Sequence, residues 1–334
     1  MNFLHRANIN THSRSSVKTF RKRLASIWAK IPRPYFALQS LVKNYDSPWK
    51  KPADILYLGD SVLERTSSND TDKRTVDQMT ASGLSNEKRL LCISRPAYHL
   101  KVYYHLLSVL QHMRNRPCLV ILPINIRSFS PQWDLNPAWQ FDEEIEVMNA
   151  YAQTRKIPAL RGNLDMLTFS EAERNLEFDF PFTDLKRIGQ FVDLINNIPS
   201  DPDGKFYRRK QIYILHYLKT LVPDHRRLLY LGKTLGLLQN LRIKVLVYIT
   251  PINYQGGIRH VGDGFVDLIR SNVDVVNNFM SPYFENGLVR FMDLQEYLSS
   301  DYFFHADELT EHLNQFGRAK LAQTLVNEIE NWWN

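Results

Sequence analysis

The sequence lacks several features that define specialised classes of protein. It has only two cysteines among 334 residues, which is too few for a disulfide framework. Cys92 and Cys118 both lie inside apolar runs, which predicts buried free thiols. No apolar run reaches the roughly 18–20 residues that a transmembrane helix needs. The N-terminus also lacks the apolar core of a secretory signal, and we therefore expect a cytoplasmic protein.

Motifs for common cofactors are also missing. There is no G-x-G-x-x-G or Walker A sequence, which argues against a dinucleotide or P-loop site. No group of His and Cys has the spacing of a zinc site. The composition, 44% hydrophobic and 23% charged residues, is ordinary for a globular protein. We expect a folded protein that uses neither a cofactor nor a metal.

Positive charge is concentrated at the N-terminus. Residues 1–51 contain 11 Lys or Arg and one acid, Asp46, whereas the rest of the chain contains 31 basic and 34 acidic residues. The net charge of +7 therefore belongs to this N-terminal arm and not to the body. Because a nucleic-acid-binding body would need a basic face of its own, we expect no nucleic-acid partner.

Residues 17–31 of the arm have the pattern of a basic amphipathic helix. Apolar side chains, Trp28 among them, recur at spacings of three and four, and most of the basic side chains fall on other faces. Such a helix either packs on its own domain or lies on an anionic membrane surface or a partner. Pro32 and Pro34 end the helix, and residues 35–51 are predicted to be a linker. Peripheral membrane contact through 17–31 thus stays open.

Five short apolar runs alternate with helix-period segments in the body. They are ILYLG at 55–59, RLLCIS at 89–94, CLVILPI at 118–124, IKVLVYITPIN at 243–253 and LVRFMDL at 288–294. Apolar strands that alternate with helices predict a parallel sheet covered on both faces. We expect an α/β fold, a three-layer α/β/α sandwich with a five-stranded, flavodoxin-like parallel sheet.

The connection between the third and fourth runs is far longer than one crossover needs. Residues 130–222 contain several helical patterns and predict a mostly helical insertion that caps one edge of the sheet. The organisation we expect is a basic arm over 1–51 and one α/β domain over 52–334 that contains this insertion.

The carboxyl ends of the predicted strands bring polar residues to one edge of the sheet. Ser61 follows the first strand, Asn125 follows the third, and His312 follows the last. In open parallel sheets, ligands bind beyond these ends. We therefore expect a site that combines a hydroxyl, an amide and an imidazole.

Ser61 is the candidate nucleophile. Gly59 permits a sharp turn from strand to helix, and a following helix would direct its free N–H groups at the serine. A serine hydroxyl needs a base within hydrogen-bond reach. We predict His312 as that base, with His305 in reserve. The alternatives are that Ser61 is a plain helix N-cap and that His312 is a surface or capping residue.

An acid should orient the imidazole and stabilise its charged form. Asp307, Glu308 and Glu311 all precede His312 within five residues, and Asp307 is the favoured candidate. Either this acid completes a triad, or the serine and the histidine act without one.

The predicted site also contains hydrogen-bond donors for an oxyanion and two arginines that could bind an anionic substrate. The side-chain amide of Asn125 and the backbone N–H of Ser61 are candidate oxyanion donors. Ala97 is a third, because the proline before it has no N–H. Asn125 is equally suited to forming a turn. Arg95 and Arg127 either hold an anionic substrate, such as an acidic sugar, or form salt bridges with the acidic body.

These residues resemble the conserved blocks of the SGNH (GDSL) hydrolase superfamily. A strand followed by Gly-Asp-Ser at 55–61 is similar to its first block, and Asn125 corresponds to the asparagine of its third. His312, with the helix that follows, is similar to its fifth block. The resemblance implies that Ser61 is the nucleophile and His312 the base.

Two positions depart from the family pattern. Leu309 stands where the family has an aspartate, three residues before the histidine. The glycine of the second block has no clear equivalent around Ser94–Ala97. Asp307, Glu311 or no acid at all then completes the catalytic group.

The resemblance implies a serine esterase or an O-acyltransferase. Water as the acceptor gives an esterase and a sugar hydroxyl gives a transferase, and an insertion over the site could exclude water. The long insertion and the YITPIN strand are also similar to the branch that contains the alginate acetylation proteins and the D-alanine transfer protein of teichoic acids. That similarity implies an acylated carbohydrate or a cell-envelope glycan precursor as the substrate. The alternative is a catalytically inactive SGNH-like module that binds a glycan or a membrane-assembly partner.

Overall fold

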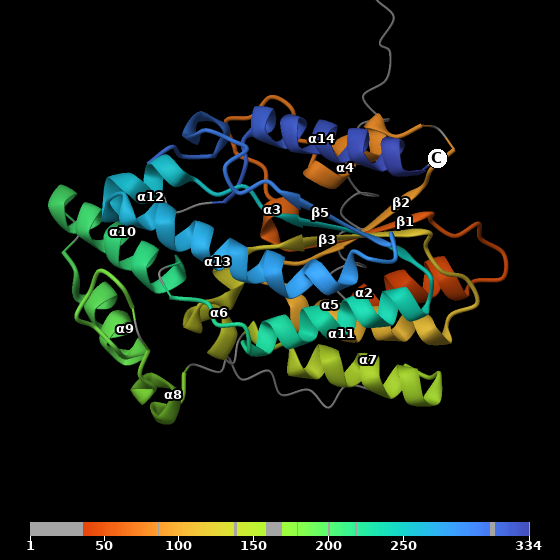
Figure 1. The fold of residues 1–334 in the computed structure, drawn as a ribbon, viewed down its shortest axis with the longest axis horizontal. Coiled ribbons are helices and arrows are strands. Elements are labelled where there is room, and N and C mark those ends of the chain that lie inside the picture. The colour runs from red at the N-terminus through yellow and green to blue at the C-terminus, as the bar shows by residue number, and fades with distance from the viewer. Residues whose placement is uncertain are drawn as a thin grey trace, which may run out of the picture.

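A five-stranded sheet lies at the centre of the protein, and all its strands run parallel (Figure 1). The computed structural model describes residues 36–85, 87–136, 139–157, 169–178, 180–199, 201–217, 219–307 and 311–333. The strands are β1 (Ile55–Gly59), β2 (Leu90–Ser94), β3 (Leu119–Ile124), β4 (Lys244–Ile249) and β5 (Val289–Asp293). Their order, β2-β1-β3-β4-β5, is the flavodoxin-like order. The predicted sheet is confirmed.

Helices cover both faces of this sheet (Figure 1). Successive strand residues point to opposite faces, so Ile55 and Tyr57 belong to one hydrophobic core and Leu56 and Leu58 to the other. The first core is covered by α4 (Val76–Gly83) and α14 (Gln315–Trp333). The second is covered by α2 (Phe36–Leu41), α5 (Leu100–Ser108), α11 (Arg226–Asn240) and α13 (Gly264–Met280). The three-layer α/β/α architecture is therefore as predicted.

The segment before β1 differs from the prediction. Residues 36–46, expected to be part of a linker, form α2 and a π-helical turn over Val42–Asp46. Leu38, Leu41 and Tyr45 are fully buried in the second core, which also contains Leu56 and Leu58. This burial stabilises helical structure that the local sequence alone does not indicate.

The helix after β1 is short. α3 (Ser61–Glu64) is a single turn, and the chain leaves it in an extended conformation at Arg65. The next helix, α4, begins only at Val76.

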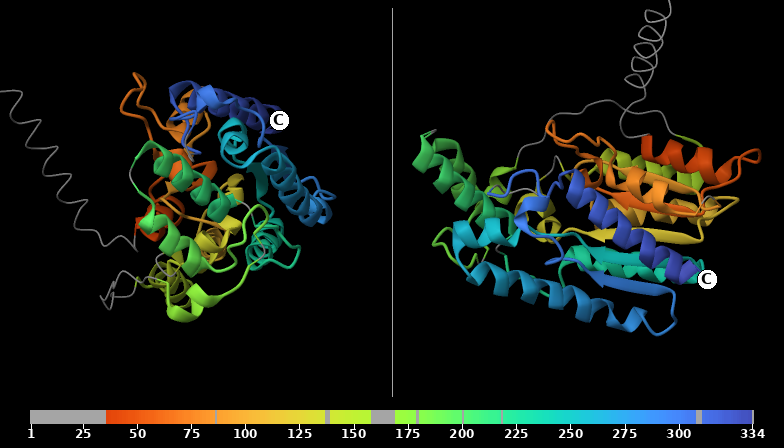
Figure 2. Two further views of the ribbon diagram at one scale, coloured as in Figure 1. Left: turned by 90° about the vertical axis from the view of Figure 1, so that its left-hand side faces the viewer. Right: turned by 90° about the horizontal axis from the view of Figure 1, so that it is seen from above.

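The predicted insertion between β3 and β4 is mostly helical. It contains α6 (Pro131–Leu135), α7 (Asp142–Thr154), α8 (Glu171–Asn175), α9 (Ile188–Asn197) and α10 (Pro202–Tyr217). In Figures 1 and 2, α8, α9 and α10 extend past the carboxyl end of the sheet, and α10 lies beside α12 (Tyr254–Val261). Side chains of α7, α9 and α10 belong to the same hydrophobic core as one face of the sheet. The insertion and the sheet therefore pack as one body.

In the described part of the chain, no helix combines the length and the apolarity needed to cross a membrane. The predicted basic helix over 17–31 lies outside the described residues.

The prediction of two buried thiols is wrong for Cys118. Cys92 is partly buried, but Cys118 is exposed. It immediately precedes β3, where the strand enters the sheet at its amino edge, and no layer covers it there.

Candidate active site

The turn after β1 places Ser61. Asp60 caps α3 by accepting a hydrogen bond from the N–H of Val62 at 2.8 Å. Ser61 is the first residue of the helix and is buried. Gly59 is needed for close packing, and its backbone is not in the left-handed region. A Cβ at Gly59 would lie 2.1 Å from Cδ1 of the buried Leu63.

The structure brings Ser61 and His312 together, although they are 251 positions apart in the sequence. Nε2 of His312 lies 3.1 Å from Oγ of Ser61, a distance at which a base can take the hydroxyl proton. Ser61 is not the N-cap of its helix, because Asp60 has that role. The reserve candidate, His305, is exposed.

Contacts between two backbone segments hold His312 in place. The N–H of Phe304 donates to the carbonyl of His312 at 2.9 Å, and the N–H of Asn314 donates to the carbonyl of Tyr302 at 3.0 Å. In the first turn of α14, a Cβ at Gly317 would lie 2.4 Å from the carbonyl oxygen of Tyr302. The absence of a side chain at Gly317 therefore allows α14 to begin against the segment that orients the imidazole.

A buried arginine joins α14 to the loop that follows α3. Arg318 is fully buried, and its Nη1 lies 2.7 Å from a carboxylate oxygen of Asp70. It also donates to the carbonyls of Asp72 at 2.6 Å and Arg74 at 2.9 Å. The loop after Ser61 and α3 and the helix after His312 are thus joined to each other. Sequence reasoning missed this contact, although Arg318 lies at helical spacing from the core residue Leu321, which was a signal of burial.

The imidazole of His312 is held in its neutral form. Burial is the main cause, and the positive charges of Arg127 and Arg65 add to it, so that the pKa of His312 falls to about 3. A neutral imidazole can accept the proton of Ser61. The same neighbours disfavour the imidazolium that this transfer creates.

Asp307, the acid favoured from sequence, does not contact His312. Its side chain is 54% exposed and its carboxylate forms an ion pair with Arg259. Its carbonyl oxygen lies 3.0 Å from Nε2 of His260. The exposed guanidinium holds the carboxylate away from the site. Glu308, the second acid considered, lies outside the described residues.

Glu311 is buried next to His312 in the sequence, but its carboxylate binds other residues. Oε2 accepts a hydrogen bond from Nδ2 of Asn125 at 2.9 Å and lies 3.2 Å from the guanidinium of Arg127. Oε1 accepts a hydrogen bond from the hydroxyl of Tyr217. The buried negative charge is thereby compensated by Arg127 and two neutral donors.

Asn125 bridges two carboxylates. Besides Glu311, its Nδ2 donates to Asp60 at 3.0 Å, so both amide hydrogens are used. Its Oδ1 accepts from the N–H of Arg127 at 3.1 Å. Burial and the negative charge of Glu311 raise the pKa of Asp60. This cluster holds two carboxylates, and nowhere among the described residues do three or more His, Cys, Asp or Glu side chains gather as a metal site.

The two arginines predicted near the site both have carboxylate partners within the protein. Besides its ion pair, Arg127 stacks on the ring of Trp133 at 4.6 Å. Arg95 lies 2.7 Å from a carboxylate oxygen of the buried Glu144 and covers the ring of Phe141. Of the two interpretations that the sequence left open, these contacts favour salt bridges with the body.

A small pocket, called the serine pocket below, opens beside the nucleophile. Its lining residues are Asp60, Ser61, Ala97, Tyr98, His99, Asn125, Arg127, Ser128 and Trp133. Its empty volume, the open mouth included, is about 260 Å³. Ala97 has a left-handed backbone with a φ of 67°. Among the hydrogen bonds of the described residues, none uses the N–H of Ser61 or of Ala97, so both predicted backbone donors are available at this pocket.

The protein was compared with known families, curated proteins and solved structures. No protein-family model and no curated protein matches the sequence. Among solved structures, it is similar to a variant of an acetyl-xylooligosaccharide esterase from Geobacillus stearothermophilus, with 13% identity and a TM-score of 0.42 over 82% of this chain and 93% of the other. A catalytic variant of the same acetylxylan esterase gives 12% identity and a TM-score of 0.41 over the same shares. A candidate acylhydrolase from Bacteroides fragilis gives 13% identity and a TM-score of 0.35 over 90% and 97%.

Proposed function

We propose that the protein is a serine-dependent acyl-ester hydrolase or O-acyltransferase of the SGNH type. The observation that supports this most directly is the 3.1 Å contact between Nε2 of His312 and Oγ of Ser61. The contact lies beyond the carboxyl ends of parallel strands, where sites of this fold class form. The imidazole is neutral there, as a general base must be.

The reaction follows from the positions of these groups. Oγ of Ser61 attacks the ester carbonyl carbon while Nε2 of His312 takes the hydroxyl proton. The N–H groups of Ser61 and Ala97 donate to the developing oxyanion. The C–O bond to the alcohol then breaks, and His312 returns the proton to the leaving oxygen. Water or a sugar hydroxyl attacks the acyl-serine by the same steps in reverse.

Asn125 and Arg127 can act in this scheme only if they change or share their present carboxylate partners. Both line the serine pocket. Asn125 becomes a third oxyanion donor by exchanging one of its two carboxylate partners for the oxyanion. Arg127 contacts a substrate only as one half of its ion pair with Glu311. Asp307 has no role in the scheme.

The insertion supports transfer as well as hydrolysis. Trp133 of α6 forms part of the wall of the serine pocket, so the insertion contributes to the enclosure of this pocket. A covered site restricts the access of water to an acyl intermediate and favours a bound hydroxyl as the acceptor. We propose an acylated carbohydrate or a cell-envelope glycan precursor as the substrate, on the similarity of the long insertion and the YITPIN strand to glycan-acylating relatives.

Labelling with a fluorophosphonate probe tests the nucleophile. The intact protein should form a covalent adduct, because the probe reacts with an activated serine hydroxyl. Ser61→Ala should not react, and His312→Asn should react at least 100-fold more slowly. The exposed Ser82→Ala on α4 is the control and should label like the wild type. Labelling that survives Ser61→Ala would refute the assignment.

One observation favours the alternative, an inactive module that binds a glycan or a membrane-assembly partner. Both amide hydrogens of Asn125 are held by carboxylates, which leaves the oxyanion two backbone donors. If well-folded wild-type protein neither labels nor hydrolyses a small acetyl ester, the inactive module becomes the better assignment.

A further inference from the structure

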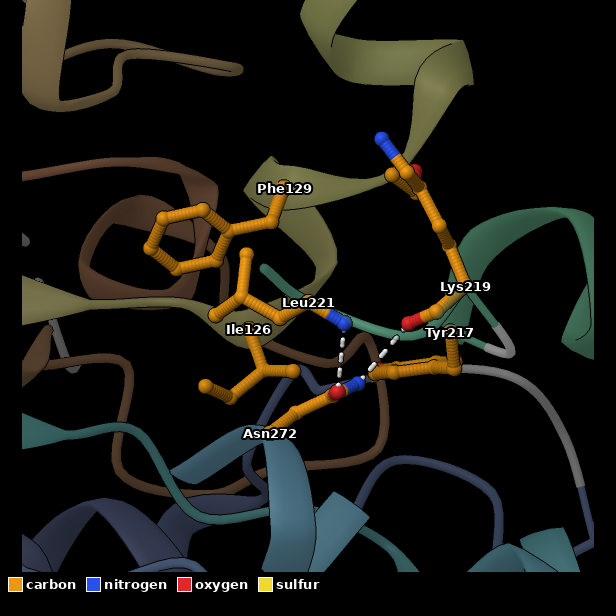
Figure 3. Close-up of a pocket in the computed structure, with 7 residues that line it drawn as sticks. Ile126, Phe129, Tyr217, Lys219, Leu221 and Asn272 are labelled. Carbon is orange, nitrogen blue, oxygen red and sulfur yellow. Dashed lines mark hydrogen bonds between the residues drawn. The ribbon is translucent and has the colours of Figure 1, made fainter. Parts of the chain in front are cut away.

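A second pocket lies beside the segment that follows β3. Residues of this segment are divided between the two pockets, since Asn125, Arg127 and Ser128 line the serine pocket. The second pocket, called the lysine pocket below, is lined by Ile126, Phe129, Ser130, Tyr217, Lys219, Leu221 and Asn272 (Figure 3). Its empty volume, including the mouth, is about 230 Å³.

Most polar groups of the lysine pocket have partners within the protein. Oδ1 of Asn272 accepts from the N–H of Leu221 at 2.8 Å, and its Nδ2 donates to the carbonyl of Lys219 at 2.9 Å (Figure 3). The hydroxyl of Tyr217 donates to a buried carboxylate. Ser130 differs: it is 3% exposed, and its hydroxyl finds no hydrogen-bond partner in the part of the chain that the structure describes. A buried hydroxyl without a partner is costly, and a bound molecule that forms a hydrogen bond with it would remove that cost.

The second unsatisfied group is the ammonium of Lys219. Among the described residues it has no carboxylate within ion-pair distance, and its neighbour is the ring of Phe178 at 5.2 Å. Two acids, Asp134 and Asp224, act on its charge, and Asp134 is already shared by Nε of Arg226 at 2.7 Å and Nε of Arg227 at 2.8 Å. Positive charge therefore exceeds negative charge around this pocket. Burial lowers the pKa of Lys219, and Arg226 lowers it further while Asp134 opposes the shift.

We propose that the lysine pocket binds a small organic carboxylate. Nζ of Lys219 forms the ion pair with it, and Oγ of Ser130 donates the second hydrogen bond. Ile126, Phe129 and Leu221 form an apolar wall that suits a short alkyl chain. One ammonium and one hydroxyl match a monoanion, whereas a phosphate dianion requires more donors than the pocket supplies.

Calorimetric titration with propionate tests the proposal directly. The wild type should bind propionate, and should bind the uncharged isostere propionamide at least tenfold more weakly. Lys219→Gln should weaken propionate binding at least tenfold, and Ser130→Ala should weaken it about threefold or more. Lys205→Gln, at an exposed position of α10, is the control and should bind like the wild type.

The proposal fails if propionate does not bind, or if it binds the wild type and both pocket variants equally. Near-ultraviolet circular dichroism shows whether each variant is folded. If Lys219→Gln is not folded, the binding of propionate to Ser130→Ala tests the proposal by itself. Ser61→Ala should bind propionate like the wild type, because the lysine pocket does not include the nucleophile. A failure here would therefore leave the proposed esterase activity untouched.

Turnover then distinguishes two sources of the carboxylate. If the carboxylate belongs to the substrate, propionate should compete with an ester that carries a carboxylate. Lys219→Gln should then raise KM for that ester, but not for the same ester with an uncharged amide in place of the carboxylate. If it is a separate effector, propionate should change kcat for a neutral ester. Tyr217 offers a route for the second case, because it lines the lysine pocket and donates to Glu311.

Discussion

His312 contacts the hydroxyl of Ser61, and the charges of two arginines act on its imidazole. Burial and the charges of Arg127 and Arg65 lower the pKa of the imidazole to about 3, well below the ordinary value of 6.5. In the proposed reaction only the neutral imidazole acts as the base. Activity should therefore persist at a pH at which an ordinary histidine is protonated.

The pH profile of kcat/KM for a neutral acetyl ester tests this expectation. The acid limb should lie well below pH 6.5, because the group loses its function only as the pH falls through its own pKa. Replacing the exposed Arg65 by Gln should move the limb upward by a fraction of a pH unit, since one repelling charge is removed and solvent screens it. High salt should also move the acid limb of the wild type upward, and it should move that of the variant little. A limb near 6.5 in the wild type would contradict the expectation.

The parts of the site that follow from sheet topology could be predicted from the sequence. Ser61 and His312 each follow a strand, and a parallel sheet brings such positions to one edge. The positions of the Asp307 and Glu311 carboxylates could not be predicted, because the path of a loop depends on distant partners. Asp307 is held by Arg259 of α12, and Glu311 by a tyrosine 94 positions away in the insertion. Neither partner leaves a local signal in the sequence.

At the scale of elements, the packing of α14 positions His312, the proposed base. Its first turn packs against the carbonyl of Tyr302, where Gly317 leaves room for the backbone. Arg318 then ties the helix to the loop after α3. A small displacement of this helix would change the distance between the imidazole and the hydroxyl, and catalysis is sensitive to such shifts.

Gly317→Ala should separate this effect from ordinary helix propensity. A Cβ 2.4 Å from a backbone oxygen forces α14 away from residue 302, so kcat/KM should fall at least tenfold and stability should fall by roughly 1–3 kcal/mol. Gly236→Ala in α11 is the matched control, because a Cβ there would meet no atom within 4 Å. It should leave kcat/KM unchanged and stabilise the protein by about 0.5–1 kcal/mol. Ester hydrolysis and urea unfolding measure both quantities, and equal effects of the two variants would disprove the role of Gly317.

Regular elements were predictable to different degrees. The five strands follow from short apolar runs, because strands buried on both faces need continuous apolar sequence. α2 was missed because its three buried side chains are stabilised by the core beneath the sheet. The end of α3 could not be predicted, because the loop from 65 to 75 is fixed by Arg318, which lies more than 240 positions later.

At the scale of the whole molecule, the insertion and the sheet share one core that holds neutral histidines. Burial is the main cause in each case: it lowers the pKa of His216 to about 3 and that of His225 to about 4, and it lowers the pKa of His99 as well. An unfolded chain binds protons at these positions near pH 6.5, whereas the folded chain does not. Their contribution to stability is therefore present above pH 6.5 and is lost as the pH falls toward 4. Glu144 opposes this trend, because burial raises its pKa to about 7.

Urea unfolding between pH 7.5 and 4.5 should show this loss. Each neutral histidine adds about 1.4 kcal/mol per pH unit to the slope below pH 6.5, and the histidines outnumber Glu144. His216→Gln should make the slope shallower by about that amount, because it removes one group that the unfolded chain protonates. The exposed His112→Gln is the control and should leave the slope unchanged. A stability that is constant over this range would rule out buried neutral histidines as the cause.

The fastening of Arg318 to the loop after the nucleophile has a consequence for biosynthesis. A ribosome releases Ser61 long before it releases His312 and α14, so a growing chain carries an inert hydroxyl. The hydroxyl meets the imidazole of His312 only when the late helix docks onto residues 70–74. If the proposed function is correct, incomplete chains lack acyl chemistry, and reactivity toward a serine probe reports how far folding has proceeded.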